Sequence, residues 1–134
     1  MRESLSNINK VGRFIFFVLL CLFFLSVIIQ FFLAGMAVFV SPANWMKHTF
    51  FVHLFGFNIP VLLLLFAFVG RLPNWAYWGI FGLFITVFGM YITANFNPLL
   101  GAIHPIVGIV MILISYHLLK KNVELIFLKR EGDN

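Results

Sequence analysis

The chain has 134 residues, of which 63% are hydrophobic, 19% aromatic and only 10% charged. A soluble domain is about half apolar and about a quarter charged, so the composition excludes an ordinary soluble protein and predicts one membrane domain over residues 1–134. The net charge of +5 sits at the ends of apolar runs rather than in a patch, which is typical of a topology signal and not of a nucleic-acid-binding surface.

Four apolar segments follow one another along the chain. Lys, Arg, Asp and Glu are absent from 14–46, 48–70 and 72–119, and a helix needs about 20 apolar residues to cross the hydrocarbon core. The last stretch is long enough for two crossings and carries an Asn-Pro turn at 97–98. The sequence therefore predicts an all-α, antiparallel four-helix bundle in the membrane, with spans at about 14–39, 48–69, 75–94 and 100–119.

The distribution of Lys and Arg predicts the orientation. Eight of the nine lie before span 1, between spans 2 and 3, or after span 4, and Lys47 alone lies on the other side. By the positive-inside rule both termini are cytoplasmic, and we expect a multi-pass protein of the bacterial cell membrane. The basic tail, 120–134, is amphipathic, so two interpretations stay open: it lies along the inner leaflet, or it only anchors the topology.

Each predicted span carries one stripe of small or polar residues among Phe, Leu, Ile and Val. Small residues let membrane helices approach closely, and polar ones form hydrogen bonds between them. The residues expected to pack helices together are Gln30, Gly56, Gly82, Gly89 and Gly108.

Two histidines on these stripes suggest a cofactor. His53 and His104 each lie about 7 Å below the outer ends of spans 2 and 4, given a helical rise of 1.5 Å per residue. Facing histidines on two helices of a bundle can hold b-type haem, each offering one nitrogen to the iron. We therefore expect His53 and His104 to be haem-iron ligands, with Gly89 and Gly108 leaving room for the macrocycle.

Other polar residues near the outer face leave alternatives open. His48 lies about 140° around a regular helix from His53, so it is an alternative ligand or a polar group near the haem edge. Lys47 beside it can pair with a propionate, whereas His117 is expected to be an interfacial residue without a role. A metal ion held by histidines without haem, and purely structural histidines, also remain as alternatives.

The segments 30–35 (QFFLAG), 45–48 (WMKH), 52–56 (VHLFG) and 103–106 (IHPI) resemble a small bacterial family of four-helix membrane proteins of uncharacterised function. More loosely, the chain is similar to one half of haem A synthase, whose four-helix bundles present histidines on their second and fourth helices. That resemblance implies haem ligation by His48 or His53 with His104. The glutamate and arginine of that pattern are missing, with Asn44 and Thr49 nearby, so it implies haem binding rather than haem oxidation.

The sequence thus predicts a small membrane protein that binds haem b for electron transfer or haem handling. The alternative is a non-catalytic accessory or scaffold subunit of a membrane complex, with structural histidines and with a second membrane protein or further copies of this chain as partners. A small transporter or channel is less favoured, because no span carries a charge. An enzyme is not expected, because all acidic residues lie in the two tails: Glu3, Glu124, Glu131 and Asp133.

Overall fold

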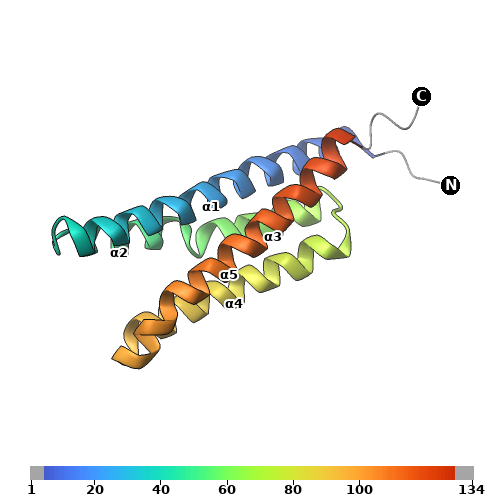
Figure 1. Cartoon of the computed structure of the whole chain (residues 1–134). Helices are drawn as coiled ribbons and strands as arrows, with labels where there is room; N and C mark the ends of the chain where they lie inside the picture. Colours follow the sequence, from blue (N-terminus) through green and yellow to red (C-terminus); the bar gives the residue numbers. More distant parts are fainter. Residues whose placement is uncertain (1–4, 129–134) are drawn as a thin grey trace.

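The computed structural model describes residues 5–128 and is entirely helical apart from turns (Figure 1). Its elements are α1 (Asn7–Phe39), α2 (Asn44–Phe55), α3 (Asn58–Val69), α4 (Asn74–Asn95), α5 (Pro98–Val123) and a π-helical turn, η1 (Glu124–Leu128). The start of α1 and the end of α5 lie at one end of the bundle (Figure 1), called here the terminal end. The α1–α2 and α4–α5 turns lie at the other, the distal end.

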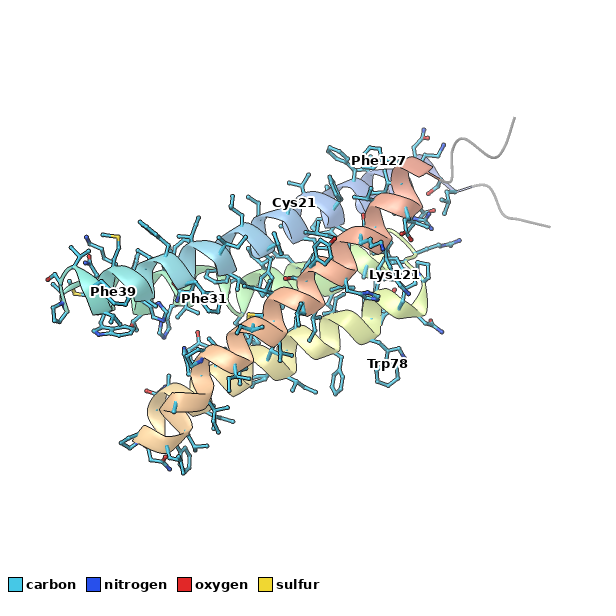
Figure 2. All side chains as sticks on the ribbon, viewed as in Figure 1. Cys21, Phe31, Phe39, Trp78, Lys121 and Phe127 are labelled. Atoms are coloured by element: carbon cyan, nitrogen blue, oxygen red, sulfur yellow. The ribbon has the colours of Figure 1, made fainter. Side chains whose placement is uncertain are left out.

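Four helices are long and apolar enough to cross a membrane: Asn7–Phe39, Asn44–Val69, Asn74–Asn95 and Pro98–Phe127. This confirms the all-helical class and the predicted number of membrane-length helices. Their outer surfaces are apolar, as expected for helices in contact with lipid. Figure 2 shows Trp78 projecting away from α4, where 73% of its surface is exposed.

The helices extend beyond the predicted spans at the terminal end. α1 begins seven residues earlier, at Asn7, because Ser6 and Asn9 form a reciprocal capping box. At the other end of the chain, α5 continues through Lys120 and Lys121, and η1 places the ring of Phe127 5.7 Å from that of Phe17. Residues 120–128 of the predicted tail are therefore helical, with Phe127 in contact with α1, while 129–134 lie outside the described residues.

The second membrane-length helix is broken at Gly56-Phe57, between α2 and α3. Pro60 has no N–H to donate to the carbonyl of Gly56, four residues earlier, so the α-helical ladder stops there. The side chain of Asn58 turns back and donates to the carbonyl of Leu54 at 2.8 Å. This amide satisfies a carbonyl that the break would otherwise leave unpaired.

Side chains from α1 close the other end of α3. Asn9 Nδ2 donates to the carbonyl of Val69 at 2.9 Å, and Arg13 Nε donates to that of Gly70 at 2.8 Å. Arg13 also reaches the carbonyl of Arg71, at 3.2 Å. These last carbonyls of a helix have no intrahelical partner and carry partial negative charge, which a guanidinium satisfies.

The apolar core fills the terminal half of the bundle. Its fully buried side chains include Phe16, Leu20, Phe23, Leu63 and Leu83. Towards the distal end the α1–α2 hairpin and the α4–α5 hairpin diverge (Figure 1). Three of the four histidines lie on these diverging hairpins: His48 and His53 on α2, and His104 on α5.

Candidate cofactor site

A cavity of about 830 Å³ lies between the two diverging hairpins, lined by residues of α1, α2, α4 and α5. Its volume falls within the range of about 300–1,000 Å³ that is usual for sites of small molecules and cofactors. The wall is mostly apolar, with a few polar side chains. Three histidines lie on it: His48, His53 and His104.

His48 is held against α1 by two hydrogen bonds with Gln30. Its Nδ1–H donates to the backbone carbonyl of Gln30 at 3.1 Å, and Gln30 Nε2 donates to the carbonyl of His48 at 2.8 Å. Because a carbonyl only accepts, Nδ1 carries the proton in the neutral ring and Nε2 keeps its lone pair. Gln30 is 5% exposed, and its Oε1 has no hydrogen-bond partner among the described residues.

His104 is held against α4 in the same way. Its Nδ1 lies 3.1 Å from both the carbonyl of Met90 and Thr93 Oγ1. The Thr93 hydroxyl donates to the carbonyl of Gly89 at 2.7 Å, so its oxygen can accept from His104. The Nε2 of His104 therefore also keeps its lone pair.

The structure brings His48, and not His53, against His104. The ring centroids of His48 and His104 are 6.4 Å apart. Two imidazoles on opposite sides of one metal, each at about 2.0–2.1 Å through nitrogen, have centroids about 6.3 Å apart, because a ring centroid is about 1.1 Å from its nitrogen. Two rings in simple contact can have the same spacing, so the engaged Nδ1 atoms and the cavity are what favour a ligand pair.

His53 lies farther along α2, exposed, at the side of the cavity that faces α4. Its Nδ1–H donates to the carbonyl of Thr49 at 2.6 Å, and its ring centroid lies 5.6 Å from that of Tyr91. The rings that lie next to each other in the structure are those of His48, the alternative ligand, and His104, while the pairing of His53 with His104 at one iron stays a prediction. His117 is exposed on α5, and it does not line the cavity. Lys47 is also exposed and is not part of the cavity wall.

The glycines divide into two groups. A Cβ at Gly82 or Gly89 would lie 3.2–3.3 Å from side chains of α5, and one at Gly108 would lie 2.8 Å from Phe31 of α1. These positions pack helices together, and Gly89 and Gly108 do not line the cavity. At Gly56 the close neighbour, at 2.7 Å, is the carbonyl of Val52 in its own hairpin.

Gly35 and Gly101 differ from the packing glycines. Both line the cavity; a Cβ at Gly35 would meet nothing within 4 Å, and one at Gly101 would meet only the carbonyl of Thr93, at 3.9 Å. No contact between helices requires a residue without a side chain at these two positions, whereas a ligand between the hairpins would require the space that a side chain would fill. In addition, Pro105 has no N–H for the carbonyl of Gly101, which leaves that acceptor without its helical partner.

The ligand inventory limits the chemistry. Within residues 5–128 no three His, Cys, Asp or Glu side chains are placed so that they could hold one metal ion, whereas structural zinc sites use four protein ligands and catalytic ones three. Glu124 is the only acidic residue of the described range and lies at the terminal end. The cavity therefore offers the Nε2 atoms of three imidazoles, two of them in the adjacent rings of His48 and His104, and no carboxylate for general acid–base catalysis.

Sequence reasoning did not identify the residues that orient the two histidines. The backbone carbonyls of Gln30 and Met90 and the hydroxyl of Thr93 act across helix pairs, so no local pattern reveals them. Gly101 could have been identified from the sequence, because a glycine four residues before a proline combines the lack of a side chain with a backbone carbonyl that has no helical partner.

Part of the chain matches a known family model. Residues 30–95 match the model of a family of unknown function (DUF6220). The matched region includes Gln30, His48, His53, Tyr91 and Thr93, but ends before His104. No curated protein and no solved structure matches the chain, so the resemblance to haem A synthase stays an expectation from the sequence.

Proposed function

We propose that this chain is an integral membrane protein that binds b-type haem between His48 and His104, for electron transfer or haem handling. The observation that carries the proposal is that the rings of His48 and His104, from α2 and α5, lie 6.4 Å apart on the wall of a largely apolar cavity, each with Nδ1 engaged and Nε2 available. Engagement of Nδ1 by a carbonyl is the usual way in which proteins orient a metal-bound imidazole and increase its basicity.

The residues fit haem better than a bare metal ion. Two imidazoles leave most coordination positions of a free ion unfilled, whereas a porphyrin supplies four nitrogens of its own. The space at Gly35 and Gly101 and the apolar wall suit a flat macrocycle. When bound, haem would supply reversible one-electron chemistry, with a potential set partly by its axial ligands.

In this proposal the protein positions the cofactor and excludes water. Gln30 fixes the ring of His48, while Met90 and Thr93 fix that of His104. The proposed setting is the bacterial cell membrane with both termini in the cytoplasm, which the positive-inside rule supports: Lys10, Arg13, Lys120 and Lys121 are at the terminal end. The site would then lie in the outer half of the bilayer.

An absorption spectrum tests the proposal. Protein purified in mild detergent from cells supplied with ample haem is expected to show a Soret band and, on reduction, the sharp bands of six-coordinate haem. His48→Ala and His104→Ala should each abolish the six-coordinate spectrum, whereas His117→Ala should not change it. Absence of any Soret band in the wild-type protein would overturn the proposal.

A scaffold subunit is the second candidate, supported by the close packing of α4 on α5. A Cβ at Gly79 would overlap the side chain of Leu118, so this pair is held at short range by small residues. In that case a partner membrane protein, or a second copy of the chain, would cover the apolar outer surface. If His104→Ala leaves assembly and phenotype unchanged while Gly79→Leu abolishes them, the scaffold function is supported instead.

A further inference from the structure

The cavity has two chemically different sides. The side between α2 and α4 carries four polar side chains among apolar ones such as Val52, Val87 and Ala94; the polar ones are Thr49, His53, Tyr91 and Asn95. On the side between α1 and α5, apart from Gln30 and His104, which belong to the ligand site, the wall consists of apolar residues and glycine: Val27, Phe31, Ala34, Gly35, Val38, Gly101, Pro105 and Met111. A planar ligand held between the hairpins therefore meets polar groups along one edge and apolar surface along the other.

From this asymmetry we infer that His53 and Tyr91 bind the carboxylate edge of the ligand, while its apolar edge lies at Gly35 and Gly101. The inference rests on the proposed function, because haem b is a planar ligand with two propionates on one side of the macrocycle. His53 is thereby a carboxylate-binding residue rather than an iron ligand.

The geometry of His53 suits this role. Its Nδ1–H is used by the carbonyl of Thr49, which leaves Nε2 to interact with a ligand. Protonated at Nε2, the ring donates a charge-assisted hydrogen bond to a carboxylate. Its ring lies beside that of Tyr91, whose hydroxyl can donate to the same group.

A charged edge at this depth requires such partners. A carboxylate inside a membrane protein is costly unless it is paired or hydrogen-bonded. Apart from the proposed ligand pair, His53 is the one residue of the described cavity wall that can become cationic. Lys47 is the rival partner, but its side chain is exposed and does not line the cavity.

The apolar edge is also accounted for. The open space beside Gly35 and Gly101 accepts methyl and vinyl groups without displacing a side chain. If the ligand were reversed, the propionates would face the apolar side chains of Phe31 and Val38, and the one amide donor of α1 that lines the cavity, Gln30 Nε2, is already bonded to the carbonyl of His48.

Comparing two forms of the cofactor tests the inference. The purified apoprotein is titrated in detergent with hemin, which has two free carboxylates, and with hemin dimethyl ester, which has none. Wild-type protein should bind hemin more tightly by about tenfold or more, as expected for lost hydrogen bonds to a charged group. The His53→Ala/Tyr91→Phe variant should bind both forms equally and keep the six-coordinate spectrum.

Lys47→Met is the matched control, and it should keep the wild-type preference for hemin. The inference is overturned if wild type shows no preference, if the preference survives in the double variant, or if Lys47→Met abolishes it. Tyr91→Phe alone, which removes only a hydroxyl, should reduce the preference even if the double variant fails to fold. Binding of neither form by wild type would instead defeat the proposed function, and the inference with it.

Discussion

Only contacts between helices decide whether His48 or His53 lies next to His104. In a regular helix His48 and His53 point in different directions, and a stripe of small residues favoured His53. The break at Gly56-Phe57 ends that stripe, and the bonds between His48 and Gln30 turn His48 onto α1 instead. A sequence pattern reveals the face of one helix, but not which carbonyl of a neighbouring helix accepts from an imidazole.

Enlarging Gly35 is predicted to block the ligand without weakening the protein. Gly35→Leu places its side chain in open space in the cavity, so we expect loss of haem uptake with an unchanged melting temperature. Soret absorbance per protein and a thermal melt of the detergent-solubilised apoprotein measure the two effects. Uptake equal to wild type would contradict the predicted location of the macrocycle.

Gly79→Leu is the matched opposite case. The added side chain must displace Leu118, which is 1% exposed, and overpacking of this kind costs about 1–3 kcal/mol of folding free energy. We expect a lower melting temperature for the apoprotein. A melting temperature equal to that of wild type would show that α4 and α5 can move apart freely.

At the scale of the elements, the ends of helices depend on side chains that are distant in sequence. Four membrane-length helices follow from the charge-free stretches, and the turns follow from their Pro and Asn residues. The break within the second helix could be predicted in part from the sequence, because Pro60 interrupts the helical hydrogen bonds. The chain leaves the helix four residues earlier, at the carbonyl to which Pro60 cannot donate. The capping of α3 by Asn9 and Arg13 could not be predicted from the sequence, because 57 or more residues separate the partners.

Removing the Arg13 cap should destabilise the bundle. Arg13→Gln loses the guanidinium that serves the carbonyls of Gly70 and Arg71, and a hydrogen bond to a charged group contributes about 1.5–3 kcal/mol. Chemical denaturation in mixed micelles measures the change. Lys10→Gln, which removes the same charge from an exposed position on α1, should have a much smaller effect; equal effects of the two would show that only net charge matters.

Restoring the helix at the break should weaken the site. Pro60→Ala supplies the missing N–H for the carbonyl of Gly56, so the helix can continue and re-aim α2, which carries His48. We expect lower haem affinity at equal or higher thermal stability, measured by Soret titration and melting. Affinity and spectrum identical to wild type would show that the break does not position His48.

At the scale of the whole molecule, the described part of the fold is compatible with the common side that the distribution of charge predicts for both ends of the chain. The start of α1 and the end of α5 lie together (Figure 1), and Lys47 lies at the opposite end, after the α1–α2 turn. The number of helices was predictable because lipid imposes a length on each. The divergence of the two hairpins could not be predicted from the sequence, because it depends on which side chains of different helices pack against one another.

Labelling with a membrane-impermeant maleimide tests the orientation. In a Cys21→Ser background, which removes the one cysteine, Lys47→Cys should react from outside intact cells, and Lys10→Cys only after permeabilisation. The reverse pattern would invert the proposed topology. Reaction of both from one side would contradict an odd number of crossings between them.

The divergence of the hairpins also determines how a ligand would arrive. Phe31 and Val38 line the cavity and keep 37% and 63% of their surface exposed, so the cavity is open beside α1 rather than sealed. If the four helices span a bilayer as proposed, this opening would be in contact with lipid. A lipophilic molecule already partitioned into the membrane can then enter by lateral diffusion, and the rate of loading follows its mole fraction in lipid rather than its concentration in water.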